Sequence, residues 1–232
     1  YYFINRNLET EIGDIDKIIY FPLHMVPERV LLIGAPYHNN QISIITNIAK
    51  SLPVGYKLYV KEHPVMKIIG WRDTYFYKQL IDNPNIVLLH PEVSSEKLIQ
   101  KSSLVITISG TAGQEALFFG KPVITFTKQP YSNLSSCHTI NTMEEIPHAI
   151  KKMLTKKIEI KELNDYVNLL IDNTFEMSTV KISTDFAYRF GFKGLIMDSE
   201  LDEEKIISFL NDNDQIFKKL AYEHIEKIRS YS

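Results

Sequence analysis

Short apolar runs alternate with amphipathic segments over the first two thirds of the chain. Five runs have the length and composition of buried strands: residues 17–21, 57–61, 86–89, 104–108 and 123–126. Between them, segments with apolar residues at helical spacing begin near Asn39 or Asn40, Arg72, Ser94 and Thr111. Because strands separated by single helices are joined by crossovers, the pattern predicts an α/β fold, a mostly parallel sheet with helices on both faces.

The same pattern divides the chain into three segments. Residues 1–16 mix aromatic and acidic residues without periodicity and are interpreted as a linker or an edge segment. Residues 17–155 contain all five predicted strands, a polar loop over 127–138 and a last helix, and are predicted to form one domain. Within them, residues 30–33 fit either a short strand or an apolar loop. Residues 156–232 are charged and lack strand runs, which predicts a helical C-terminal extension.

The stretch from Leu104 to Pro122 predicts a buried strand, a tight turn and a short helix. The apolar run is followed at once by Ser-Gly-Thr, whose small residues suit a turn. Thr111, with Gln114 three places later, fits a capping box at the helix start. Gly120 before Lys-Pro is typical of a helix C-terminus.

This turn has the chemistry of a phosphate site. The first N–H groups of a helix lack internal partners and lie at the positive end of the helix dipole, so they suit an anion. Gly110 and Gly113 would let a ligand approach the backbone, and Glu115, one turn into the helix, suits a ribose hydroxyl better than a phosphate. An equally weighted alternative is that the glycines only permit the turn and that Glu115 is a favourable charge at the helix start.

Other polar residues follow the predicted strands at their carboxyl ends. His63 comes after the run 57–61 and is held extended by Pro64, while His24 follows the run 17–21 and a polar loop follows Phe126. Ligands bind beyond the carboxyl ends of the strands in parallel sheets, so these residues are predicted to meet the Ser-Gly-Thr turn at one edge. Alone, His63 is explained more simply as a residue that ends a strand.

Composition narrows the classes of partner. Lys and Arg number 26 against 28 Asp and Glu, a net charge of −2, so the bulk charge expected of a nucleic-acid binder is absent. The single Cys137 excludes a disulfide framework. No apolar run approaches the ~20 residues that span a bilayer. A lysine cluster fits a peripheral contact with an anionic membrane, although a solvated helix end explains it more simply: Lys151, Lys152, Lys156 and Lys157.

Three motifs in order resemble bacterial capsule and surface-polysaccharide biosynthesis proteins. They are Tyr-Phe-Pro-Leu-His at residues 20–24 with Pro-Glu at 27–28, Lys-Glu-His-Pro at 61–64, and Ser-Gly-Thr with Gln-Glu-Ala-Leu and Gly-Lys-Pro-Val between 109 and 123. The resemblance covers residues 17–154. It implies one half of a GT-B glycosyltransferase, in which two Rossmann-like halves face each other and the C-terminal half holds the nucleotide of an activated sugar.

The resemblance also implies roles for individual residues. His63 is similar to a histidine that lies against the nucleotide phosphate or leaving group, and is the expected catalytic residue. His24 and Glu28 are expected to contact the donor or acceptor. The remaining motif residues are expected to bind the nucleotide sugar: Lys61, Glu62, Pro64, Ser109, Gly110, Thr111, Gly113, Gln114 and Glu115.

The implied function is transfer of a sugar from a nucleotide-activated donor, CMP- or UDP-linked, to a capsule or surface polysaccharide or a glycolipid acceptor. The chain starts with Tyr1 rather than Met, which indicates a fragment or a processed product. The resemblance implies that the N-terminal half, the expected source of the general base, is missing. One alternative is a sugar-nucleotide 2-epimerase, weakened because Ile108 stands where an acidic residue is expected. The other is a non-catalytic domain that binds a nucleotide or polysaccharide.

No cofactor beyond the nucleotide-sugar substrate and no metal are expected. Two Asp-x-Asp spacings, at residues 14–16 and 212–214, lie away from the predicted site. The remaining histidines show no metal-ligand spacing. The absence of a secretion signal and the implied pathway predict a cytoplasmic protein, at the inner face of the membrane.

Overall fold

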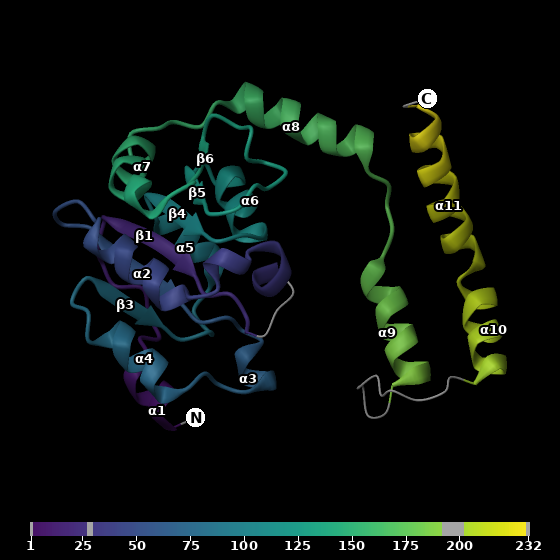
Figure 1. The fold of residues 1–232 in the computed structure, drawn as a ribbon, viewed down its shortest axis with the longest axis horizontal. Coiled ribbons are helices and arrows are strands. Elements are labelled where there is room, and N and C mark those ends of the chain that lie inside the picture. Colours follow the sequence, from purple (N-terminus) through teal and green to yellow (C-terminus); the bar gives the residue numbers. More distant parts are fainter. Residues whose placement is uncertain (1, 27–29, 192–201, 231–232) are drawn as a thin grey trace. The chain divides into compact units, whose positions relative to one another are not determined.

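The computed structural model describes residues 2–26, 30–191 and 202–230. The chain forms two compact units, Tyr1–Val167 and Asn168–Ser232 (Figure 1). The first unit contains the sheet and the predicted site, and the described part of the second unit is mainly helical.

The first unit is built on a six-stranded, wholly parallel sheet, as predicted. Its spatial order is β3-β2-β1-β4-β5-β6 (Figure 1). The strands are β1 (Ile18–Pro22), β2 (Lys57–Lys61), β3 (Ile86–Leu89), β4 (Leu104–Thr107), β5 (Val123–Thr125) and β6 (Cys137–Thr139). This is the Rossmann order, in which the chain winds outward in both directions from the β1/β4 pair.

The strand β6 begins within the last two residues of the segment predicted to be a polar loop, so that prediction is wrong at its end. Only three residues pair with β5, and two of them, His138 and Thr139, are polar and half-buried. The hydroxyls of Thr125 and Thr139 are 3.0 Å apart across the pair. A short, polar strand at the sheet edge carries no apolar run for sequence reasoning to detect.

Helices cover both faces of the sheet, as predicted. The helices α2 (Gln41–Lys50), α4 (Thr74–Ile81) and α7 (Ile146–Met153) pack on one face, and α5 (Ser95–Lys101) and α6 (Thr111–Phe118) pack on the other. The side chains of Asn40, Asp73 and Ser94 cap α2, α4 and α5 by accepting a backbone N–H of the first turn. Because Asp73 is the cap, α4 begins at Thr74, later than predicted.

The connections at the carboxyl edge carry short helical turns. The segment Val30–Gly34 forms a π-helical turn, which makes the strand alternative for this segment wrong, and Pro36–His38 forms a 3-10 turn. The short helix α3 (Met66–Ile69) follows β2. The predicted helix before the C-terminal extension starts as a 3-10 turn at Met143–Glu145 and continues as α7.

The N-terminal segment packs on the edge of the sheet. Its helix α1 (Tyr2–Asn7) and the following residue place Ile4 and Leu8 in the hydrophobic core. Glu9 then forms a parallel bridge with Leu89 of the outer strand β3. This segment therefore extends the sheet rather than standing apart from it.

The described part of the C-terminal extension forms helices, as predicted. The helix α8 (Ile160–Asn173) crosses the boundary between the units, and α9 (Thr179–Phe190), α10 (Glu203–Asp212) and α11 (Asp214–Arg229) follow. In the second unit, the rings of Phe186, Phe190 and Phe217 pack around the buried Phe209, at centroid distances of 5.6, 5.8 and 6.0 Å. Arg189 forms ion pairs with Asp185 and Asp212 beside this cluster.

Candidate functional site

The predicted residues meet at the carboxyl edge of the sheet, where β1 and β4 lie side by side and the strand order reverses. Connections that leave two adjacent parallel strands in opposite directions open a crevice at this point. A cavity of about 160 Å³ lies there, against the end of β1, the end of β2 and the start of α6. Six of the predicted residues line it: Lys61, Glu62, His63, Pro64, Thr111 and Glu115.

The other predicted residues stand in different relations to this cavity. Ser109 and Gly110 form the turn that leads into α6, and His24 contacts that turn. Gln114 lies half-buried on α6. Glu28 lies outside the described residues.

The start of α6 carries no side-chain cap. Gly110 is the N-cap residue, with φ 94° and ψ −171°, a conformation that only glycine adopts readily. Thr111 is the first helical residue, so the predicted capping box between Thr111 and Gln114 is wrong. As a result, no side chain satisfies the first N–H groups of the helix, which leaves them available to an anion.

Gln129, in the loop after β5, holds this turn and was not singled out from the sequence. The backbone N–H of Gly110 donates to its Oε1 at 3.3 Å. Its Nε2 donates to the hydroxyls of Ser109 at 3.0 Å and Thr127 at 2.9 Å. The prediction that the loop after Phe126 reaches this edge is the only sequence signal that could have pointed to Gln129.

Tyr131 explains the glycine at position 113. Its hydroxyl donates to the carbonyl of Gly110 at 2.7 Å. A Cβ at Gly113 would lie 2.4 Å from the same hydroxyl, closer than real contacts allow. Gly113 is buried, and the absence of a side chain there makes room for Tyr131. Of the two glycines predicted to let a ligand approach the backbone, only Gly110 remains a candidate.

His24 connects the end of β1 with the turn after β4. Gln41 fixes its backbone, accepting from the His24 N–H at 2.9 Å and donating to its carbonyl at 3.1 Å. Its Nε2 accepts the backbone N–H of Ser109 at 3.4 Å and lies 3.3 Å from the Thr107 hydroxyl. Burial, with the charges of His63 and Arg72, lowers the pKa of His24 to about 4. His24 is therefore a neutral hydrogen-bond acceptor at neutral pH.

Glu62 is fully buried and satisfied by protein groups. Its Oε2 accepts from Arg72 Nε and from the Tyr77 hydroxyl, both at 2.8 Å. Its Oε1 accepts the backbone N–H of His63 at 2.6 Å and Arg72 Nη2 at 3.2 Å. Arg72 Nη2 also donates to the carbonyl of His24. Glu62, expected from the resemblance to bind the donor, thus has its carboxylate committed to holding the segments that carry His24 and His63.

His63 is oriented by its own turn. Its Nδ1 accepts the backbone N–H of Val65 at 3.2 Å. Since one ring nitrogen of a neutral imidazole accepts and the other donates, this bond assigns the proton to Nε2. The half-buried ring lines the cavity, so Nε2–H is a donor that a phosphate oxygen can use.

Lys61, the last residue of β2, places a cationic side chain at the cavity. Its burial lowers the pKa of the ammonium group to about 8, against the opposing effect of the neighbouring Glu62 charge. Lys61 is still mostly protonated at neutral pH. The protonated form would be favoured further by an anion in the cavity.

The far side of the cavity is formed by Tyr20, Ser95 and Glu115. Burial raises the pKa of Tyr20, a hydrogen bond with Ser95 opposes this effect, and the Glu115 charge adds to it. Glu115 itself is exposed, one turn into α6, as a hydroxyl-binding carboxylate requires. Tyr20 and Ser95 were not predicted as site residues, because Tyr20 lies in an apolar run and Ser95 is the first residue of a helix.

Among the described residues, no group of three or more His, Cys, Asp or Glu side chains is placed to hold a metal ion. Within residues 2–26, 30–191 and 202–230, every helix is too short or too polar to cross a bilayer.

Comparison with known proteins identifies relatives of the first unit. The family model described as capsule polysaccharide biosynthesis protein matches residues 5–135, which include every predicted site residue. A curated relative, Protein FixF of Sinorhizobium fredii (strain NBRC 101917 / NGR234), is 27% identical over 136 residues. The match covers 55% of this chain and 31% of FixF, so the chain spans about a third of that relative's length.

Two solved structures are similar to part of the chain at low identity. The β-Kdo 2,4 transferase KpsC of Thermosulfurimonas dismutans is 19% identical, with a TM-score of 0.46 over 58% of this chain and 41% of that chain. The UDP-GlcNAc 2-epimerase of Methanocaldococcus jannaschii, solved with UDP-GlcNAc and UDP, is 19% identical, with a TM-score of 0.46 over 67% of this chain and 41% of that chain.

Proposed function

The chain belongs to the capsule polysaccharide biosynthesis protein family, and we propose that its first unit binds the nucleotide of a CMP- or UDP-linked sugar as the donor-binding part of a glycosyltransferase. The observation that carries the proposal is the small cavity at the β1/β4 switch point. This cavity is lined by the cationic Lys61, the imidazole N–H of His63, the uncapped start of α6 and the exposed carboxylate of Glu115.

The phosphates of the donor fit the side of the cavity formed by His63, Lys61 and the start of α6. Each of these groups offers hydrogen bonds or positive charge to an anion. Glu115, on the next turn of α6, would repel a phosphate at short range but accepts hydrogen bonds from ribose hydroxyls. The arrangement therefore orients a nucleotide with its phosphates toward β2 and its ribose toward α6.

The same groups assist the departure of the nucleotide. Breaking the bond between sugar and phosphate leaves negative charge on the leaving oxygen. The backbone N–H groups after Gly110 and the Nε2–H of His63 stabilise this charge without having to reorganise. The sugar carbon that loses this bond forms a new bond to the oxygen of an acceptor hydroxyl, and the hydroxyl proton passes to a general base outside this cavity. We propose that the acceptor is a growing capsule or surface polysaccharide.

The epimerase alternative receives less support from the site. Ile108, at the position where an acidic residue was expected, is fully buried in the core. Its carbonyl accepts the Thr127 hydroxyl at 2.9 Å, which fixes this residue as part of the turn's framework. A carboxylate could not take this place without being buried among apolar side chains.

Calorimetric titration with CMP, CDP, UDP and GDP tests the proposal. We expect one nucleotide to bind selectively, and Glu115→Ala to weaken it by about 1.5–3 kcal/mol, the range for hydrogen bonds to a charged group. Ser109→Ala, which disturbs the turn before α6, should also weaken binding. The matched control is Glu159→Ala, which removes an exposed carboxylate outside the cavity. The proposal fails if no nucleotide binds, or if both site variants bind as tightly as the control.

A further inference from the structure

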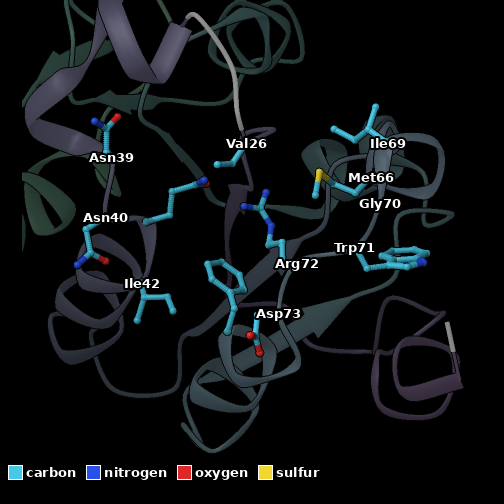
Figure 2. A pocket seen from close by; sticks show the side chains of 12 residues that line it. Val26, Asn39, Asn40, Ile42, Met66, Ile69, Gly70, Trp71, Arg72 and Asp73 are labelled. Carbon is cyan, nitrogen blue, oxygen red and sulfur yellow. The ribbon is translucent and has the colours of Figure 1, made fainter.

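A larger cavity, of about 590 Å³, lies between the β1 to α2 connection and the segment that joins β2 to α4. Figure 2 shows Asn39, Asn40 and Ile42 on one side of it, Met66 and Ile69 on the other, and Arg72 between them. Its volume falls in the range of small-molecule sites, about 300–1,000 Å³. None of the residues that line it lines the smaller cavity.

Arg72 forms the wall between this cavity and His24. Its side chain is only 7% exposed, and its Nε and Nη2 are used by Glu62 and the His24 carbonyl. Its Nη1 makes no hydrogen bond with any described residue. This buried guanidinium therefore keeps one donor nitrogen for a ligand.

The rim adds hydrogen-bonding groups of both kinds. Asn40 and Asp73 each use Oδ1 to cap a helix, accepting from Ser43 at 3.0 Å and from Tyr75 at 2.7 Å. Within the described part of the chain, the amide nitrogen of Asn40 and the Oδ2 of Asp73 have no partner. Asn39 brings a further exposed amide.

Below this rim the lining is apolar. The Phe76 ring packs beneath the Arg72 guanidinium, with 4.9 Å between Cζ and the ring centroid. Ile42 and Met66 complete an apolar lining on either side. An apolar surface with donors and acceptors at its rim matches a pyranose ring, which has apolar C–H faces and hydroxyls around its edge.

The local charge selects against an anionic ligand. Glu62 neutralises Arg72, which leaves the Asp73 carboxylate as the uncompensated charge among the lining residues. A carboxylate or phosphate would be repelled at short range, whereas neutral hydroxyls can donate to Asp73 and accept from Arg72 Nη1.

From this geometry we infer that the larger cavity is a subsite for a neutral sugar ring. The inference rests on the proposed function only for the source of the ring, which is either the transferred sugar of the donor or a sugar unit of the acceptor. Gln41, which lines the cavity, and Arg72 both bind the backbone of His24, and His24 in turn contacts the Ser109 turn. A sugar bound there lies beside the segment that holds the donor phosphates.

The only tryptophan of the chain, Trp71, lines the cavity and reports on it directly. Its fluorescence and its indole N–H resonance can be followed during titration with methyl β-galactopyranoside, N-acetylglucosamine, maltose and glucuronic acid. We expect at least one neutral sugar to shift both signals saturably and glucuronic acid to bind less tightly. If no neutral sugar shifts them, or if glucuronic acid binds more tightly than the neutral sugars, the inference is wrong.

Two variants test the rim. Asn39→Ala and Asp73→Asn should weaken the sugar about three- to tenfold, the loss of one hydrogen bond, and Asn still caps α4 in the second variant. The matched controls Asn133→Ala and Asp82→Asn change exposed residues outside the cavity. Equal affinity in the rim variants and their controls would overturn the assignment.

Titrations with nucleotides distinguish a donor sugar from an acceptor sugar, and they test nucleotide binding separately from the sugar subsite. A donor sugar predicts that UDP-GlcNAc, but not UDP, shifts the Trp71 indole resonance. An acceptor sugar predicts that the free sugar shifts this resonance equally with and without bound UDP. Glu115→Ala should weaken nucleotide binding about ten- to hundredfold without changing the affinity for the free sugar. Sugar binding without nucleotide binding would refute only the proposed function, and nucleotide binding without sugar binding would refute only the sugar subsite.

Discussion

Replacing Arg72 with leucine tests the buried ion pair between Glu62 and Arg72 at the carboxyl edge of the sheet. The substitution removes both bonds to the Glu62 carboxylate and the bond to the His24 carbonyl. Glu62, which is fully buried, keeps only the Tyr77 hydroxyl and the His63 N–H as partners. The variant therefore leaves a charge in the core without its counter-ion.

The structure sets the size of the effect. Removing one partner of a buried ion pair costs about 3–5 kcal/mol, a large part of the roughly 5–15 kcal/mol that stabilises a typical domain. The exposed pair between Lys67 and Glu92, whose side chains are 28% and 68% exposed, gives a matched control in the same unit. Lys67→Leu should cost no more than about 1 kcal/mol.

Urea denaturation followed by circular dichroism measures both variants. This signal avoids Trp71, whose fluorescence could respond to the neighbouring substitution itself. We expect a much lower midpoint for Arg72→Leu and a small change for Lys67→Leu. If the two variants lose the same stability, Glu62 and Arg72 do not behave as a buried ion pair, and this pair does not hold the carboxyl edge of the sheet together.

Three further predictions address the same edge. Burial lowers the pKa of Lys61 to about 8, so the affinity for the nucleotide should fall as the pH rises through about 8. Calorimetry near this pH should show proton uptake on binding. An affinity that does not change with pH would show that Lys61 does not bind the nucleotide. The folded-state pKa of His24 is about 4 against an ordinary 6.5, so the unfolded chain binds more protons between these values. The free energy of unfolding should drop by up to about 3 kcal/mol as the pH falls from 6.5 to 4, and His24→Gln should remove this part of the pH dependence. Gly113→Ala should displace Tyr131 and lower the free energy of unfolding, measured by chemical denaturation, by about 1–3 kcal/mol. Gly34→Ala, where the new Cβ meets open space, should lower it little. Equal losses in the two variants would mean that Gly113 is not required for packing against Tyr131.

The sheet could be predicted because each central strand is a run of apolar residues buried on both faces. Ile18 to Phe21 and Leu104 to Val105 are almost completely buried, as the runs imply. The edge strand β6 escaped prediction because pairing with β5, rather than burial of an apolar run, holds Cys137–Thr139 in place.

The positions of the site residues were easier to predict than their roles. Strand ends fix where His63 and the turn before α6 lie, and topology brings them together. Glu62 was assigned to the ligand by resemblance, yet Arg72, ten residues later in a loop, turns its carboxylate into the core. A contact of this kind depends on how the segment that joins β2 to α4 folds back, which no local pattern encodes.

The turn at Gly110 shows the same limit. Sequence spacing favoured a cap from Thr111, but the positive φ of Gly110 moves the cap one residue earlier. Gln129 and Tyr131 then hold the turn from a loop about twenty residues away. Long-range side-chain contacts replaced the local cap, and they leave the helix start open toward the cavity.

The Glu62 and Arg72 pair touches both cavities, since Glu62 lines the smaller one and Arg72 the larger one. Replacing a buried ion pair with apolar residues of similar volume is often neutral or stabilising. We therefore predict that the pair's main contribution is to fix the position of one cavity relative to the other. The double variant Glu62→Leu/Arg72→Leu should therefore recover most of the stability lost in Arg72→Leu, because no charge is left buried. It should not recover affinity for the nucleotide or the sugar, because the segments of His24 and His63 are no longer held. Recovery of binding together with stability would mean that packing alone positions the two cavities.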